Sequence, residues 1–109
     1  MSIPETSVIA RYFEAAARRD IDVIVALFGD EAVVVDEGQT YHGTEEIRGW
    51  REGVASAYQY TTQVHDTKRL DEESSLVTGR LTGTFPGGTA ELQWRFTVHH
   101  DLISRLEIE

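Results

Sequence analysis

The sequence predicts an α+β fold in which helices cover one face of a curved antiparallel sheet. In the first half of the chain, apolar residues recur at three- and four-residue steps, which places them on one face of a helix. A valine run at residues 33–35 interrupts this pattern and indicates a strand. From Tyr60 onward the period changes to two, the spacing of strands with one buried face.

The first predicted helix covers roughly residues 1–18. Ser2 and Glu5 fit a capping box, in which each side chain accepts a hydrogen bond from an unpaired backbone N–H of the first turn. The apolar stripe of this helix consists of Val8, Ile9, Tyr12, Phe13 and Ala16.

Two further helices are predicted before the main sheet. Asp20 is the expected N-cap of a short second helix that ends at Gly29, because glycine readily adopts the left-handed conformation of helix C-termini. Thr44 is the expected N-cap of a third helix. The apolar residues of the second helix are Ile21, Ile24, Val25 and Phe28, and those of the third are Ile47, Trp50, Val54 and Tyr58.

The predicted sheet combines one early strand with a later antiparallel meander. The early strand, residues 32–36, ends in Asp36. The meander consists of residues 60–70, 76–85, 90–99 and 102–108, joined by short turns. In its third strand, Leu92, Trp94, Phe96 and Val98 alternate with polar residues and share the face that the helices must cover.

Composition excludes several classes of function. The chain has 109 residues, enough for one domain with one pocket. Ten Lys and Arg against 19 Asp and Glu give a formal charge of −9, which disfavours nucleic acid and anionic membranes as partners. The absence of cysteine excludes disulfides and catalytic thiolates. With no transmembrane stretch or secretory signal in the sequence, the cytoplasm is the expected location.

The four histidines do not predict a metal site. His42, His65, His99 and His100 lack the spacing of metal ligands, and we expect them at turns and on the surface, with His42 near the mouth of a cavity. No glycine-rich nucleotide motif opens a helix. We therefore expect neither a metal nor an organic cofactor.

Five segments carry a resemblance to a known superfamily: residues 11–12, 20–28, 30–32, 35–36 and 41–48. Together with the order helix, helix, strand, helix, meander, they resemble the nuclear transport factor two-like superfamily, which includes SnoaL-like cyclases and ketosteroid isomerases. The resemblance extends over nearly the whole chain. It implies that residues 1–109 form one SnoaL-like domain, a cystatin-like cone of three helices and a bent sheet around a central pocket.

Among these relatives, ketosteroid isomerase offers the nearest functional parallel. The resemblance implies that Tyr12 donates a hydrogen bond to a substrate oxygen and that Asp36 moves the proton. The isomerase has a second acid, kept neutral by an apolar site. Strand counting puts Trp94 in its place here, and Glu37 replaces the proline that usually follows the aspartate.

Two classes of function follow from this resemblance. The first is a cofactor-independent isomerase, cyclase or dehydratase that acts on a small hydrophobic carbonyl or cyclic compound through Asp36 and Tyr12. The second is a non-catalytic ligand-binding or dimerisation module. In either class the expected ligand contacts are Trp94, Trp50, Phe28, Phe96, Tyr58 and Val34. Large apolar residues at this spacing are generally core residues, but in a cone fold core residues also line the cavity.

The outer face of the meander is amphiphilic. Arg80, Gln93, Arg95 and Thr97 lie on it by strand parity. We expect a homodimer that forms through this face of the sheet, as the resemblance also implies.

Overall fold

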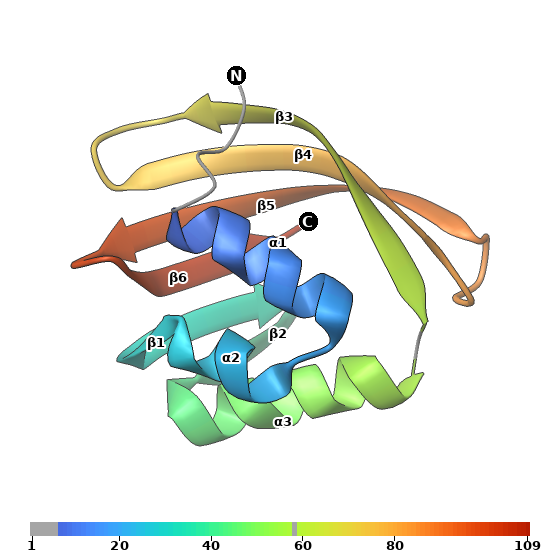
Figure 1. Ribbon diagram of the computed structural model, residues 1–109, viewed down its shortest axis with the longest axis horizontal. Coiled ribbons are helices and arrows are strands. Elements are labelled where there is room, and N and C mark those ends of the chain that lie inside the picture. Colours follow the sequence, from blue (N-terminus) through green and yellow to red (C-terminus); the bar gives the residue numbers. More distant parts are fainter. Residues whose placement is uncertain (1–6, 58) are drawn as a thin grey trace.

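The computed structural model describes residues 7–57 and 59–109, and of these every side chain except those of residues 55 and 56. Figure 1 shows a curved sheet with helices on its concave side, so the predicted α+β class is confirmed. No helix in the described part of the chain is long and apolar enough to cross a bilayer. The elements are α1 (Val8–Arg18), α2 (Ile21–Ala26), β1 (Phe28–Asp36), β2 (Gln39–His42), α3 (Gly43–Ala57), β3 (Tyr60–Arg69), β4 (Ser74–Gly83), β5 (Thr89–His99) and β6 (Leu102–Ile108).

Short polar side chains cap the first two helices. The Ser7 hydroxyl accepts a hydrogen bond of 3.1 Å from the backbone N–H three residues later. The described part of α1 begins at Val8, and the predicted capping box at Ser2 and Glu5 lies outside the described residues. Asp20 caps α2 as predicted, with an equivalent bond of 3.2 Å.

The second helix ends earlier than the sequence predicts. It stops at Ala26, and Gly29 lies inside β1, which already begins at Phe28. The reason is pairing with a distant strand: Phe28 lies opposite Ile103 of β6, and the Ile103 N–H donates to the Leu27 carbonyl at 2.8 Å. Sheet hydrogen bonds thus take up residues that were expected to complete the helix.

A short hairpin strand, β2, was missed by the sequence prediction. Glu37 and Gly38 both have positive φ, 53° and 75°, and form the two-residue turn that folds β2 back onto β1. Glutamate is uncommon in this conformation, which is why the turn carries a weak sequence signal. The next helix, α3, begins at Gly43, one residue before the predicted cap Thr44.

The sheet is mixed, whereas the sequence predicted an antiparallel one. Its strand order is β2-β1-β6-β5-β4-β3, and β1 runs parallel to β6 while every other neighbouring pair is antiparallel. The parallel pair joins the early strand to the last strand of the predicted meander. As a result, the carboxyl ends of β1 and β6 reach the same edge of the molecule.

Two glycines in β4 allow the sheet to bend closely over the helices. A Cβ atom on Gly79 would clash with the Gln63 carbonyl and press on the Trp94 ring. One on Gly83 would clash with the backbone at Gln59 and with Tyr60. Close approach of β3 at these two points, together with a bulge between Val64 and Asp66, curls the end of the sheet around a hollow.

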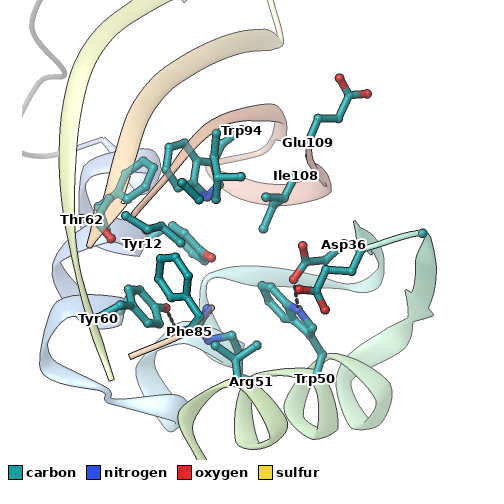
Figure 2. Close-up of a pocket in the computed structure, with 18 of the residues that line it drawn as sticks. Tyr12, Asp36, Trp50, Arg51, Tyr60, Thr62, Phe85, Trp94, Ile108 and Glu109 are labelled. Atoms are coloured by element: carbon teal, nitrogen blue, oxygen red, sulfur yellow. Dashed lines mark hydrogen bonds between the residues drawn. The ribbon is translucent and has the colours of Figure 1, made fainter. Parts of the chain in front are cut away.

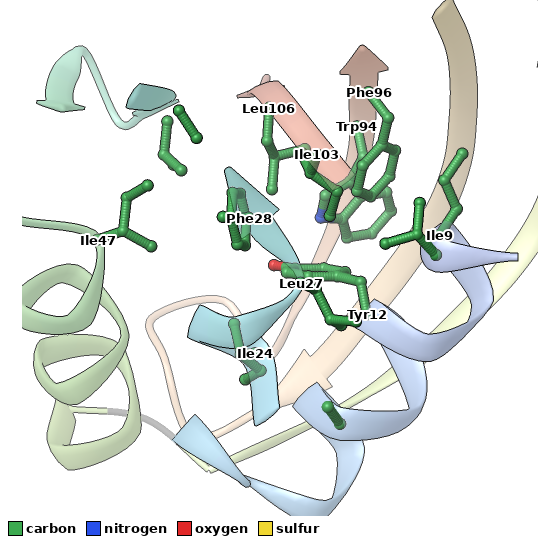
Figure 3. Packing of buried hydrophobic residues seen from close by; sticks show 14 of the residues in the cluster. Ile9, Tyr12, Ile24, Leu27, Phe28, Ile47, Trp94, Phe96, Ile103 and Leu106 are labelled. Atoms are coloured by element: carbon green, nitrogen blue, oxygen red, sulfur yellow. The ribbon is translucent and has the colours of Figure 1, made fainter. Parts of the chain in front are cut away.

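The hydrophobic core fills the opposite end of the concave face. Figure 3 shows side chains from α1, α2, α3 and the central strands meeting there. The largest fully buried side chains are Phe96, Ile24, Ile47, Ile103, Leu106, Val34 and Val77.

Candidate functional site

A cavity of about 570 Å³ lies between α1, the second half of α3 and the curled end of the sheet (Figure 2). This volume is typical of pockets that enclose a small organic molecule. Most of its wall is apolar, formed by side chains such as Phe13, Val54, Leu81, Phe85, Leu92 and Ile108. Several polar residues also line the cavity: Tyr12, Asp36, Glu37, Arg51, Tyr60, Thr62 and Glu109.

Asp36 reaches the cavity because it is the last residue of β1. Strand alternation places it on the same face as the buried Val34, but one step closer to the open end. The Trp50 indole N–H donates a hydrogen bond of 3.0 Å to Asp36 Oδ2. This bond fixes the carboxylate, which is half-buried and lines the cavity.

Trp94 forms part of the wall beside Asp36. Asp36 lies opposite Ile108 on β6, and Ile108 lies opposite Trp94 on β5, so the three residues form one row across neighbouring strands. The Trp94 ring packs edge-on against Phe13 at a centroid distance of 5.2 Å. Trp94 therefore lines the cavity two strands away from Asp36.

Tyr12 enters from α1 and is almost completely enclosed. It is 2% exposed, and its ring makes edge-on contacts with Phe13, Phe28 and Phe96. Burial raises the pKa of Tyr12 to about 12, and the positive charge of Arg51 offsets only part of that effect. At neutral pH the hydroxyl therefore keeps its proton and is a hydrogen-bond donor at the edge of the cavity.

Arg51 is a cavity residue that the sequence prediction missed. It is 5% exposed, its Nη2 donates to the Tyr60 hydroxyl at 3.0 Å, and its guanidinium lies 5.0 Å from the centre of the Trp50 ring. Burial lowers the pKa of Arg51, but the nearby Tyr12, Tyr60 and Asp36 oxygens raise it by more, so the side chain stays charged.

A sequence signal for Arg51 did exist. Arg51 lies four residues after Ile47 and three before Val54, on the apolar stripe of α3. A charged residue on a buried helix stripe is uncommon and marks either a snorkelling side chain or a functional group.

Of the eight predicted site residues, four line the cavity. These are Tyr12, Asp36, Trp50 and Trp94. The structure places Phe28, Phe96 and Val34 in the hydrophobic core, away from the cavity wall. They lie on the same face of the sheet as the cavity residues, but nearer the end that the core fills, which we call the closed end. Tyr58 lies outside the described residues.

The histidines lie away from the cavity. His42, expected at its mouth, is 57% exposed and pairs with Glu31 at 3.2 Å; it is not part of the cavity wall. His65, His99 and His100 are exposed as well. Within residues 7–57 and 59–109, no three potential metal-ligating side chains form a cluster.

Solved structures with the same architecture include three informative relatives. A proposed polyketide cyclase from Sinorhizobium meliloti has 31% sequence identity and a TM-score of 0.91, over 98% of this chain and 95% of that one. A Catenulispora acidiphila protein with a ketosteroid isomerase-like fold, solved with trimethylamine, has 16% identity and a TM-score of 0.86, over 99% and 86% of the two chains. An epoxide hydrolase/cyclase-like enzyme of pyran ring formation in salinomycin has 20% identity and a TM-score of 0.82, over 93% and 85%.

Sequence comparison agrees with this structural likeness. No curated protein matches the chain significantly. Residues 9–105, however, match the SnoaL-like domain family. The chain therefore belongs to the SnoaL-like domain family, and its fold is the cone of the nuclear transport factor two-like superfamily.

Proposed function

We propose that the cavity binds a small hydrophobic carbonyl or cyclic compound and that Asp36 moves a proton on it, without a cofactor. Tyr12 donates a hydrogen bond to the carbonyl oxygen as negative charge develops there. Isomerisation, cyclisation and dehydration all need this combination of a base and a donor.

The observation that carries this proposal is the setting of the Asp36 carboxylate. Its Oδ2 is held by Trp50, while its Oδ1 has no hydrogen-bond partner among the described side chains and backbone groups. A fixed carboxylate at the wall of an apolar cavity suits proton abstraction, because little reorganisation is needed when the substrate arrives.

The proposed reaction begins at a carbon next to the carbonyl group. Asp36 takes a proton from that carbon, the electron pair of the C–H bond forms a carbon–carbon double bond, and the π pair of the C=O bond moves onto the oxygen to give an enolate. Tyr12, which keeps its proton at neutral pH, donates a hydrogen bond to that oxygen. The protonated Asp36 then returns the proton to a different carbon in an isomerisation, or to the oxygen of an internal carbonyl that the enolate attacks in a cyclisation. In a dehydration it protonates a departing hydroxyl, which leaves as water.

The Sinorhizobium meliloti relative supports a reaction of this class, because its proposed activity is a polyketide cyclisation and it shares 31% of its residues with this chain. A cyclase of carbonyl compounds needs an enolate as its nucleophile. The substrate class of this protein is accordingly an enolisable compound that fits a cavity of about 570 Å³.

The proposal can be tested without knowing the natural substrate. β-Tetralone, a bicyclic enolisable ketone, exchanges its α-hydrogens for deuterium in heavy water, and NMR measures the rate. We expect the protein to accelerate this exchange and Asp36→Asn to remove about 10²- to 10⁴-fold of the acceleration. The matched control is Asp30→Asn, which changes an exposed aspartate on the same strand.

The outcomes separate the two classes of function. Equal exchange rates for the wild type and Asp36→Asn would refute the catalytic role of Asp36. Binding of β-tetralone with no acceleration in the wild type would instead identify a non-catalytic binding module.

We also propose a homodimer through the outer face of the sheet. Arg80, Gln93 and Arg95 are exposed on neighbouring strands β4 and β5. Arg80 Nε donates to the Glu91 carboxylate at 2.6 Å, which orders part of this face. Sedimentation at micromolar concentration should give a dimer, and a monomer there would remove the proposal.

A further inference from the structure

Arg51 is a buried cation without an anionic partner among the residues that the structure describes. None of the ion pairs of the described residues involves it. Its hydrogen bond goes to the Tyr60 hydroxyl, and its Nε atom is buried with no partner. Removal of a charge from water is costly unless an opposite charge or several hydrogen bonds compensate for it. Within the described residues, no carboxylate pairs with Arg51, and the hydrogen bond to Tyr60 satisfies only part of its donors.

Asp36 is not the missing partner. It raises the pKa of Arg51 less than Tyr12 and Tyr60 do, and its Oδ2 is bonded to Trp50 instead. In Figure 2, Trp50 stands between the two side chains, with Asp36 at one end of its indole and the Arg51 guanidinium on the other side. The cavity therefore has a positive region at Arg51 and a separate acidic region at Asp36.

The positive region has donors suited to an oxyanion. A guanidinium presents N–H groups along its edges, and a carboxylate or enolate oxygen can accept two of them. Nη2 of Arg51 donates to Tyr60 and Nε is enclosed, while the side chain lines the cavity wall, so an oxyanion in the cavity meets the remaining N–H groups of the guanidinium. Tyr12, which interacts electrostatically with Arg51, adds a hydroxyl donor from α1.

We propose that Arg51 and Tyr12 form an oxyanion subsite, and that the ligand is an apolar ring compound with a carboxylate or an acidic enol at one end. The inference rests on the proposed function in that it treats the cavity as the ligand site. It adds the substrate class and a second binding group. With the oxygen held by Arg51 and Tyr12, the adjoining part of the ring, which carries the proton that Asp36 takes, faces Asp36.

The acidic residues of the cavity support this orientation. Glu37 lines the cavity next to Asp36, and the two carboxylates would repel an anion from that region. The formal charge of the whole chain, −9, also opposes the approach of an anion. A preference for an anionic ligand must therefore arise from a local cation, and Arg51 is the arginine that lines the described cavity.

The test compares two ligands of matched shape, β-naphthoate and methyl β-naphthyl ketone, by isothermal titration calorimetry at neutral pH. For the wild type we expect at least about tenfold tighter binding of the carboxylate. Arg51→Met should weaken carboxylate binding about ten- to hundredfold while ketone binding changes by less than about threefold. Arg51→Lys, which keeps the charge but loses the fork, should fall between the two.

The matched control is Arg48→Met, which removes an exposed arginine from the same helix, paired with Asp22 at 2.8 Å. It should bind both ligands as the wild type does. Asp36→Asn should keep the carboxylate preference even though it loses proton exchange, so failure of the catalytic proposal leaves this test intact. Equal affinity of the wild type for the two ligands would overturn the proposed subsite. This comparison uses the wild type alone and so does not depend on whether a variant folds. An unchanged preference in Arg51→Met would overturn it too.

Discussion

The two ends of the concave face are built from the same elements, yet one is closed and the other is open. At the closed end Val34 of β1 and Ile47 of α3 are fully buried. Two residues farther along β1 lies Asp36, and four residues farther along α3 lies Arg51, both in the cavity wall. Periodicity places each pair on one face, but the packed end receives apolar side chains and the open end receives charged ones.

This difference shows where the sequence departs from what stability alone favours. Well-packed apolar residues at the positions of Asp36 and Arg51 would extend the core, and buried charge is costly. Local departures of this kind are expected at functional sites. The packed apolar residues of the closed end therefore account for the stability of the fold. The charged residues of the open end form the candidate ligand site.

The largest expected contrast is between two phenylalanines. Phe96 is fully buried at the closed end, so Phe96→Ala should lower the free energy of unfolding by about 3–5 kcal/mol through lost contacts and a new void. Phe85 borders the existing cavity, so Phe85→Ala should cost less than about 1 kcal/mol. Urea unfolding measures both, and equal losses would break the distinction between the two ends.

The second contrast concerns Tyr12 and alkaline pH. The folded protein raises the pKa of Tyr12 from 10.0 to about 12, so the neutral hydroxyl favours the folded state fully below pH 10 and this contribution is lost as the pH rises from 10 to about 12. The loss amounts to about 2–3 kcal/mol. Tyr12→Phe should lack this component, so its urea midpoint should fall less steeply over that window. The same pH dependence in both proteins would show that Tyr12 is not enclosed as described.

The smallest contrast uses two adjacent alanines of α1. Ala15 is 0% exposed in the core, so Ala15→Leu should overpack it and cost about 1–3 kcal/mol. Ala16 lines the cavity, and Ala16→Leu should change the free energy of unfolding by less than about 0.5 kcal/mol. It should nevertheless weaken β-naphthoate binding, because the added side chain occupies ligand space. Wild-type binding by Ala16→Leu would contradict the position of the cavity.

Much of this arrangement could be predicted from local patterns. The periods of 3.6 and 2 placed Tyr12, Trp50 and Trp94 on inward faces, the resemblance added Asp36 at the end of the early strand, and the structure brings all four to one cavity. Periodicity does not give depth along a strand, however. Phe96 and Trp94 share a face, and only the bend of the sheet decides that Phe96 belongs to the core.

The features that were missed depend on long-range or unusual conformations. The parallel pairing of β1 with β6 joins segments about seventy residues apart, for example Val34 and Leu106, and leaves no local signal. The β1–β2 turn uses Glu37 at positive φ, where glycine or asparagine would have been recognised. Arg51 was passed over because charged residues are normally excluded when an apolar helix stripe is read.

A crystal structure of the protein with β-naphthoate tests the central claim most directly, that the open end is a ligand site with opposite charges at its two regions. We expect the naphthalene ring inside the cavity, the carboxylate within hydrogen-bond distance of Arg51 and Tyr12, and the adjoining part of the ring toward Asp36. A ligand bound elsewhere, an empty cavity, or a carboxylate turned toward the Asp36 region would contradict the account.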